Sequence, residues 1–364
     1  MEITKAQILR AMSEVMDPDF GKDLVSLNMV GDISINGRHI HIEIILTTPA
    51  CPLKAQIESD INTKLTEHLG TVTVDLKFES KVTSMRTQMD LLPGVKNIIA
   101  ISSGKGGVGK STVSTNLAIA LANTGAKVGL LDADIYGPSI PLMFGLAGER
   151  PSMIELDGKD LIVPLEKYGV KVLSIGFLID PNQPVVWRGA MVTSTLKQFI
   201  TDVDWGELDY LVLDLPPGTG DIHLTLVQTI PITGAIVVTT PQPVAIADVI
   251  KSIAMFRLEQ IKVPIIGIIE NMSYFTPSEL PDKKYYVFGK EGGKNLADNL
   301  EIPFLGEIPI EQVIREGGDE GSPAVIQESS NSKNAFIRLA NEVARQVSIR
   351  NEKIAATQIV EMKN

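Results

Sequence analysis

Residues 97–112 read NIIAISSGKGGVGKST, and this stretch decides the fold of the chain. An apolar run leads into a glycine-rich loop, and Lys110 and Ser111 follow the loop directly. Residues 104–111 match the pattern G-x-x-x-x-G-K-[ST] without interruption, which is typical of a phosphate-binding loop between a strand and a helix. Glycines let successive backbone N–H groups turn toward one anion, and the following helix adds the positive end of its dipole. The stretch therefore predicts a nucleotide phosphate site.

The same loop predicts roles for individual residues. We expect Lys110 to reach the β and γ phosphates of ATP, and Ser111 to ligate Mg²⁺, an ion that prefers oxygen. A tight glycine turn without a ligand is the alternative, and the apolar run before the loop and the helix after it make this the weaker interpretation. The expected nucleotide-binding residues of the loop are Gly104, Lys105, Gly106, Gly107, Val108, Gly109, Lys110, Ser111 and Thr112.

Short apolar runs alternate with helical segments through most of the chain. After NIIAIS come KVGLLD, VKVLSIG, YLVLD, GAIVVTT, PIIGIIE and PFLGEIP. Continuous apolar runs suit parallel strands that are buried on both faces. We therefore predict an α/β fold: a doubly wound, mostly parallel sheet in a P-loop NTPase domain over residues 95–347. A polar tail follows over residues 348–364, either a frayed helix or a disordered end.

The first part of the chain, residues 1–80, predicts a small α+β domain. An amphipathic helix opens it, and Asn36-Gly37 between two alternating runs is a strong signal for a tight β-hairpin. A second amphipathic helix, at about residues 52–68, and the alternating run TVTVDLKF complete a two-layer unit. Residues 81–94 lose clear periodicity and end in Pro-Gly, so we expect a linker there.

Composition bounds the class of protein. The chain has 364 residues, with 33 Lys and Arg against 44 Asp and Glu, a formal charge of −11 that argues against nonspecific binding to nucleic acid. The 44% hydrophobic content suits a sizeable core and excludes global disorder. Cys51 is the one cysteine, so no internal disulfide can form, and no stretch has the pattern of a signal peptide or a membrane span. A cytoplasmic protein without stable membrane association is expected.

Carboxylates follow two of the predicted strands. The run YLVLD ends in Asp214, which we expect on the magnesium side of the nucleotide as the Walker B residue. The run KVGLLD ends in Asp132, and Asp134 stands two residues further on. We expect Asp132 and Asp134 to form a catalytic carboxylate pair beside the nucleotide, with Asp134 orienting the attacking water. For any one of these residues, a strand-end turn or a helix cap is the alternative.

Lys105 is a second lysine within the loop, five residues before Lys110. From its own chain it could not easily reach the same phosphates without competing with Lys110. The stretch GKGGVGKST resembles the deviant phosphate loop of the MinD/Mrp class. The resemblance implies a catalytic role for Lys105 across a homodimer interface, at the nucleotide of the partner. A solvated loop lysine is the alternative.

Further segments sharpen this resemblance over almost the whole chain. Together they look like the Mrp (ApbC-like) iron-sulfur carrier ATPases, and by this similarity Asn271 would read the adenine ring with its side-chain amide. An ordinary asparagine turn is the alternative for Asn271, and Trp187-Arg188 matches a family segment without a secure role. The segments are SSGKGGVGKSTVSTNLAIAL, LLDADIYGPSIP, VVWRGAM, DYLVLDLPPGTGD, TTPQPVAIADV and GIIENMSYF.

The first domain also resembles a known family. The run TTPACP around Cys51 looks like the PaaD/SufT-like domain that is associated with iron-sulfur assembly and is often fused ahead of Mrp ATPases. The resemblance makes Cys51 a candidate thiolate ligand of an iron-sulfur cluster. A lone cysteine that packs as a small hydrophobic residue is the alternative.

The chain departs from the Mrp pattern after ENMSYF. Carrier members usually place a CxxC pair there, so that two subunits supply four thiolates to one cluster. This chain has TPSELPD over residues 276–282, and no cysteine follows Cys51 anywhere. Glu279 and Asp282 are hard oxygen donors and poor substitutes for thiolates, so the usual bridging site is absent.

These observations and the resemblance together predict a homodimeric, magnesium-dependent ATPase. Its expected function is to bind iron-sulfur clusters and transfer them to apoproteins, with ATP and Mg²⁺ as cofactors and a [4Fe-4S] or other cluster as cargo. The expected partners are a second copy and iron-sulfur apoproteins or assembly factors, with no nucleic acid.

Two other functions remain open at this point. One is a MinD/ParA-like positioning ATPase, which the acidic balance and the lack of a basic amphipathic stripe in the tail disfavour. The other is a noncatalytic scaffold for iron-sulfur assembly, in which ATP closes the dimer and the first domain docks an assembly protein.

Overall fold

The computed structural model describes most of the chain, in two compact units. One unit comprises residues 1–83 with 348–354, and the other comprises residues 84–347 with 355–364. The predicted boundaries of the small domain and the linker stay predictions. The described residues are 3–85, 92–156, 158–179, 189–220, 223, 226–227, 229–259, 261–277, 279–280, 282–328, 330–355 and 357.

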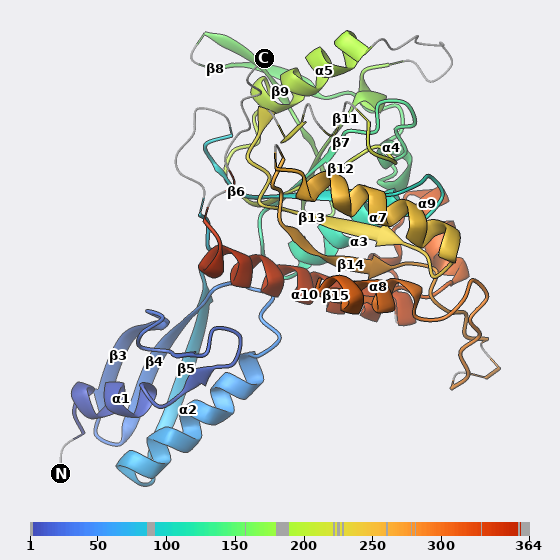
Figure 1. Ribbon diagram of the computed structural model, residues 1–364. Coiled ribbons are helices and arrows are strands. Elements are labelled where there is room, and N and C mark those ends of the chain that lie inside the picture. Colours follow the sequence, from blue (N-terminus) through green and yellow to red (C-terminus); the bar gives the residue numbers. More distant parts are fainter. Residues whose placement is uncertain are drawn as a thin grey trace. The chain divides into compact units, whose positions relative to one another are not determined.

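The larger unit is built on an eight-stranded sheet with the order β10-β11-β7-β12-β6-β13-β14-β15 (Figure 1). All neighbours in it are parallel except β10 and β11. The predicted doubly wound, mostly parallel sheet is therefore confirmed. The strands are β6 (Val95–Ser103), β7 (Val128–Asp132), β10 (Leu165–Lys167), β11 (Val170–Ser174), β12 (Leu208–Asp214), β13 (Gly234–Thr239), β14 (Ile265–Glu270) and β15 (Phe304–Glu307).

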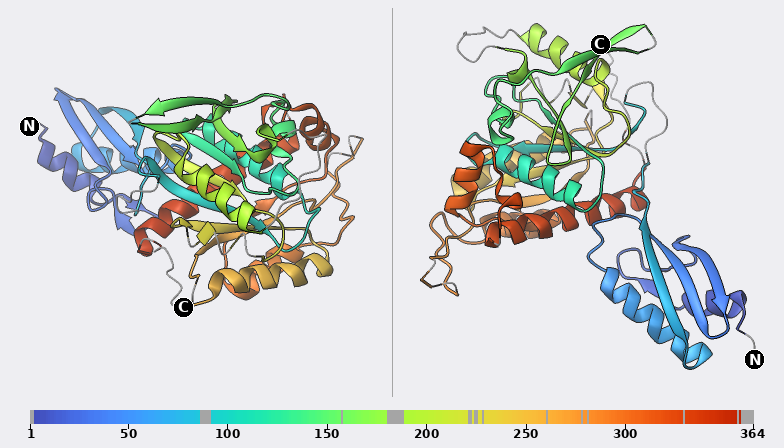
Figure 2. Two further views of the ribbon diagram at one scale, coloured as in Figure 1. Left: turned by 90° about the horizontal axis from the view of Figure 1, so that it is seen from above. Right: turned by 180° about the vertical axis from the view of Figure 1, so that it is seen from behind.

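Helices lie on both faces of this sheet (Figure 2). Side chains of α5 and α7 join one apolar core with alternate residues of β6 and β12, such as Ile98 and Leu211. The helix α3 packs on β7 and β12, and α8 packs on β14. The helices are α3 (Lys110–Asn123), α4 (Ile140–Met143), α5 (Gly189–Thr201), α7 (Pro243–Arg257), α8 (Gly292–Leu300), α9 (Gln312–Glu320) and α10 (Asn331–Lys353), with 3₁₀ turns at Ile175–Phe177 and Ala324–Ile326.

Strand register decides where the functional residues meet. Asp214 at the end of β12 stands opposite Asp132 on β7 and opposite Ile101 on β6. Because these strands are parallel, the loops that follow them leave the sheet at one edge. The phosphate loop and both strand-end carboxylates are thereby brought together, which is where ligands bind in open α/β sheets.

The smaller unit has a three-stranded sheet of β3 (Val30–Asn36), β4 (His39–Leu46) and β5 (Thr73–Ser80). The predicted hairpin is present, because β3 and β4 are antiparallel and Gly37 between them has φ of 62°. The helix α2 (Lys54–Leu69) connects the parallel strands β4 and β5. The remaining elements are α1 (Lys5–Met12), β1 (Met16–Asp17) and β2 (Lys22–Asp23).

Two further features concern the predicted tail and the surface. The helix α10 continues to Lys353, so the first residues of the predicted tail, from Ser348, are helical.

The strands β8 (Ser152–Leu156) and β9 (Lys159–Val163) pair with each other and form a separate hairpin in the larger unit. Within the part of the chain that the structure describes, no helix is long and apolar enough to cross a membrane. Trp187-Arg188 lies outside the described residues.

Candidate functional site

The loop between β6 and α3 has the backbone that its glycines permit. Gly107 and Gly109 have φ of 81° and 80°, in the left-handed region that side chains disfavour. Gly109 has a second constraint, since a Cβ there would lie 2.2 Å from Nδ2 of Asn271. The helix α3 begins at Lys110, so its N-terminal N–H groups face the same site.

Lys110 and Asp214 form a buried ion pair at the start of α3. Nζ of Lys110 lies 2.8 Å from Oδ2 of Asp214, and the two side chains are 6% and 0% exposed. Ser111 donates its hydroxyl to the same oxygen at 2.6 Å. Oδ2 of Asp214, the predicted Walker B aspartate, thus contacts both Lys110, the predicted phosphate lysine, and Ser111, the predicted magnesium ligand.

The two carboxylates that were predicted as a catalytic pair after β7 differ in how deeply they are buried. Asp132 is fully buried, and it accepts hydrogen bonds from the Ser174 hydroxyl at 2.8 Å and from the Asp134 backbone N–H at 3.1 Å. Burial, together with the negative charge of Asp214, raises the pKa of Asp132 to about 8. Asp132 is therefore mostly protonated at neutral pH in this arrangement.

Asp134 has a different environment. Its side chain is 16% exposed, and its Oδ2 lies 3.9 Å from Nζ of Lys110. Burial raises the pKa of Asp134, and the charge of Lys110 opposes this rise. Of the two residues, Asp134 is the more exposed, and its role in orienting the attacking water stays a prediction.

Lys105 and Asn271 also lie at the loop. Lys105 is partly exposed, and across the described ranges of the chain its ammonium makes no ion pair. Asn271 follows β14, and its Nδ2 donates to the backbone carbonyl of Val108 at 2.8 Å. The structure thus places Asn271 against the phosphate loop, while its contact with adenine stays a prediction. Thr112 lies in the first turn of α3.

Cys51 belongs to the smaller unit and packs against its apolar core. Burial raises the pKa of the Cys51 thiol, and the nearby charges of Asp17 and Asp19 raise it further, while backbone N–H groups at the start of α2 oppose the rise. The thiol is therefore predominantly protonated at neutral pH. No group of three or more His, Cys, Asp or Glu residues that could hold a metal occurs among the residues described.

Two serines complete the site, and the sequence analysis missed both. Ser114 donates its hydroxyl to Oδ1 of Asp214 at 2.6 Å, and Ser174 holds Asp132. Ser114 stands one helical turn after Lys110, so helical spacing could have placed it beside the loop. Ser174 ends β11 opposite Asp132, which only the strand register reveals.

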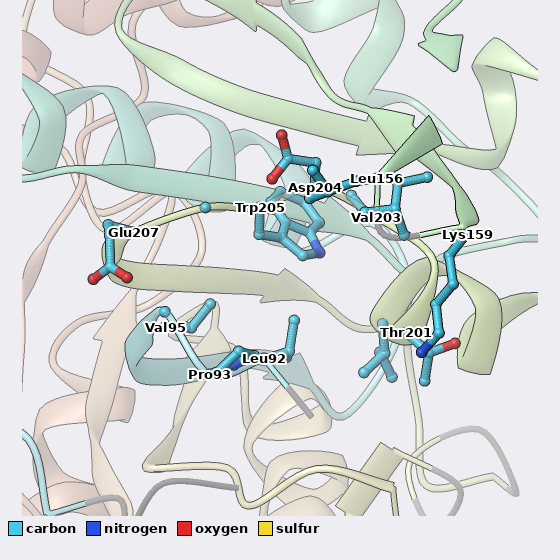
Figure 3. A pocket seen from close by; sticks show the side chains of 14 residues that line it. Leu92, Pro93, Val95, Leu156, Lys159, Thr201, Val203, Asp204, Trp205 and Glu207 are labelled. Carbon is cyan, nitrogen blue, oxygen red and sulfur yellow. The ribbon is translucent and has the colours of Figure 1, made fainter. Parts of the chain in front are cut away.

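A cavity of about 450 Å³ lies away from these residues, at the opposite edge of the sheet (Figure 3). It is lined by the segments that lead into β6 and β12 and by the hairpin of β8 and β9. Trp205 lies among its lining residues, and Lys159 points toward Thr201. None of the predicted site residues lines this cavity.

The loop, the carboxylate at the end of a neighbouring strand and the mostly parallel sheet define a P-loop NTPase. Comparison with known families makes this specific. The chain belongs to the NUBPL iron-transfer P-loop NTPase family, whose model matches residues 94–344. A second model, described as iron-sulfur cluster assembly protein, matches residues 5–76.

Individual relatives agree with this assignment. The iron-sulfur cluster carrier protein of Synechocystis sp. is 48% identical over 354 residues, which cover 95% of this chain and 99% of the relative. A nucleotide-binding protein from Archaeoglobus fulgidus, solved with ADP, is 38% identical, covers 69% of this chain and 98% of its own, and has a TM-score of 0.57. The cell division ATPase MinD of Pyrococcus furiosus is 26% identical, covers 68% of this chain and 98% of its own, and has a TM-score of 0.50.

The raised pKa of Asp132 predicts how stability depends on pH. Between the ordinary value of 3.8 and the folded value of about 8, the folded protein holds a proton that the unfolded chain has lost. The contribution of Asp132 to stability therefore falls as the pH rises through this range. Asp132→Asn keeps an acceptor for Ser174, gives up the bond from the Asp134 backbone N–H, and cannot ionise. Without nucleotide, the melting temperature of the variant should exceed that of the wild type at pH 8, by about 2–4 °C for each kcal/mol of destabilisation that the ionised Asp132 causes. The difference in melting temperature should be smaller at pH 5. Calorimetry at both pH values checks this, and a gap that does not change with pH would contradict it.

Proposed function

We propose that this protein is a magnesium-dependent ATPase that works as a homodimer and delivers iron-sulfur clusters, or assists their assembly, for apoproteins. One observation carries the nucleotide part of the proposal: Lys110, Ser111 and Asp214 meet beside a loop of glycines in the left-handed conformation. This arrangement matches what a polyphosphate and its cation require. Because a single cysteine cannot form an internal disulfide, we expect the protein in a reducing compartment, the cytoplasm.

The residues present fit a magnesium ion. The Ser111 hydroxyl and the buried Asp214 carboxylate are hard oxygen donors 2.6 Å apart, and P-loop proteins need few protein ligands because phosphates supply the rest. When bound, the ion neutralises charge on the β and γ phosphates. Lys110 would exchange Asp214 for the phosphates, and Asp134 would orient the water. Loss of the γ phosphate would then change which partners these side chains hold, which is how such sites switch shape.

The cluster part of the proposal rests on family membership and on the names of relatives. Both family models refer to iron or to iron-sulfur assembly, and the Synechocystis relative is named a cluster carrier. In this chain a cluster is cargo, and Cys51 supplies one thiol per copy. Cys51 of a second copy would add a second thiolate, and histidine, a carboxylate, a partner protein or a small thiol must provide the remaining ligands.

A noncatalytic ATP-gated scaffold is the second candidate function. The single cysteine favours it, because one thiol per copy falls well short of the four ligands that a cluster takes. In the scaffold, the smaller unit would dock an assembly protein and would not hold iron. The MinD-like positioning ATPase has only the likeness of fold and loop in its support.

Lys110→Ala should weaken ATP binding by at least about tenfold, because the phosphates lose the cation that faces them inside a water-poor site. A fluorescent ATP analogue titrated into wild type and variant measures this. Lys127→Ala is the matched control, since Lys127 is an exposed lysine before β7. Equal affinity in the Lys110 variant and the control would refute the assignment of the loop.

Lys105→Ala should leave ATP binding close to that of the wild type and reduce hydrolysis. We expect a loss of about a thousandfold in turnover, the lower end of what a cation supplied in trans contributes to phosphoryl transfer. ATP-dependent dimerisation should weaken with it. Phosphate release and sedimentation velocity, each with and without ATP, measure the two effects. Full turnover in the variant would remove the role in trans.

Cys51→Ser separates cluster carriage from the scaffold. Wild type and variant are reconstituted anaerobically with iron, sulfide and a small thiol, and bound iron and visible absorbance are measured. Carriage predicts a cluster in the wild type that is lost in the variant, because the serine hydroxyl is a poor ligand for iron-sulfide. No cluster in either protein would contradict carriage and support the scaffold.

A further inference from the structure

The carboxylate of Asp214 has two oxygens with separate partners. Oδ2 accepts hydrogen bonds from Nζ of Lys110 at 2.8 Å and from the Ser111 hydroxyl at 2.6 Å. These are the two groups expected to bind the nucleotide phosphates and the metal. Oδ1 receives the hydroxyl of Ser114 at 2.6 Å. Within the described part of the chain, Ser114 is the one side chain that hydrogen-bonds to Oδ1.

The Ser114 hydroxyl has a choice of acceptors. Its oxygen also lies 3.1 Å from the backbone carbonyl of Lys110, but a hydroxyl carries a single proton. The contact with Asp214 is shorter, and its acceptor is charged, so this is the stronger of the two bonds. Ser114 and Asp214 are both fully buried, so water is not available to replace the bond.

We propose that Ser114 is a positioning residue that fixes the orientation of the Asp214 carboxylate for the magnesium-nucleotide complex. The inference rests on the proposed function and deepens it. The terminal torsion of an aspartate is broad and nearly two-fold, so the carboxylate can rotate unless its oxygens are held. Ser114 holds Oδ1 and thereby keeps Oδ2 directed at Ser111 and Lys110.

The role of Ser114 differs from that of the loop residues. Lys110 would have to release Oδ2 in order to reach the phosphates, whereas the Ser111 hydroxyl could ligate a metal through a lone pair and still donate to Oδ2. Ser114 is fully buried, and its one other acceptor in the structure is the backbone carbonyl of Lys110, so we expect it to stay on Oδ1 when nucleotide binds. Ser114 therefore contributes to the part of nucleotide affinity that depends on magnesium, and not to the contact between loop and phosphates.

The test measures binding of a fluorescent ADP analogue, with Mg²⁺ and with EDTA, for the full-length protein. In EDTA, Ser114→Ala should bind the analogue as tightly as the wild type does. The increase in affinity that Mg²⁺ causes should be about tenfold smaller in the variant than in the wild type, the lower end for loss of a hydrogen bond to a charged group. Ser114→Thr keeps the hydroxyl and should restore the gain. Thr115→Val is the matched control, because Thr115 is the buried neighbour whose hydroxyl contacts Met143 and not Asp214.

Each outcome decides the matter. A full magnesium-dependent gain in Ser114→Ala overturns the proposal, and so does an equal loss in Mg²⁺ and in EDTA, which would mark a merely structural residue. If the alanine variant does not fold, Ser114→Cys replaces it, since a thiol is a similar size and a weak donor, and a smaller loss of the same kind is then expected. If Mg²⁺ does not increase the nucleotide affinity of the wild type, both this inference and the proposed function are overturned. If Mg²⁺ increases the affinity of the wild type and of Ser114→Ala equally, this inference alone is overturned.

Discussion

The buried ion pair between Lys110 and Asp214 is the contact on which the site depends. It joins the first residue of α3 to the last residue of β12, and both side chains are almost completely buried. A buried pair is stable only when both charges keep their partners, and removing one partner leaves a charge without compensation. Serine hydroxyls on both oxygens of Asp214 meet this requirement. A triphosphate with its cation offers Lys110 a second set of partners, so the same contact can serve as a switch.

The sequence predicted the fold because the fold follows from local patterns. Seven apolar runs marked the parallel strands, and Asn36-Gly37 marked the hairpin of the smaller unit. The short edge strand β10 and the hairpin of β8 and β9 were not predicted, because their residues are partly or fully exposed and carry no clear apolar run. The polar tail from Ser348 predicted either a frayed helix or a disordered end, and the structure extends α10 to Lys353.

The site was predictable in its motif and not in its supporting contacts. The glycine loop, Lys110 and the strand-end aspartates are visible as a pattern in the chain. Ser114 and Ser174 act through hydrogen bonds to those aspartates, and Ser174 reaches Asp132 only because β11 pairs with β7. The unequal burial of Asp132 and Asp134 likewise depends on tertiary packing, although they are two residues apart. The ligands of the proposed cluster are harder to predict still, because Cys51 is the single thiol in the sequence.

The most direct measurement is a crystal structure of the protein grown with Mg²⁺ and a nonhydrolysable ATP analogue. In such a crystal, Nζ of Lys110 should leave Oδ2 of Asp214 for the β and γ phosphates, and Lys105 of a second copy should reach the same nucleotide. Ser114 should remain on Oδ1. A nucleotide bound while the pair of Lys110 and Asp214 stays intact, with the second copy taking no part, would contradict the account.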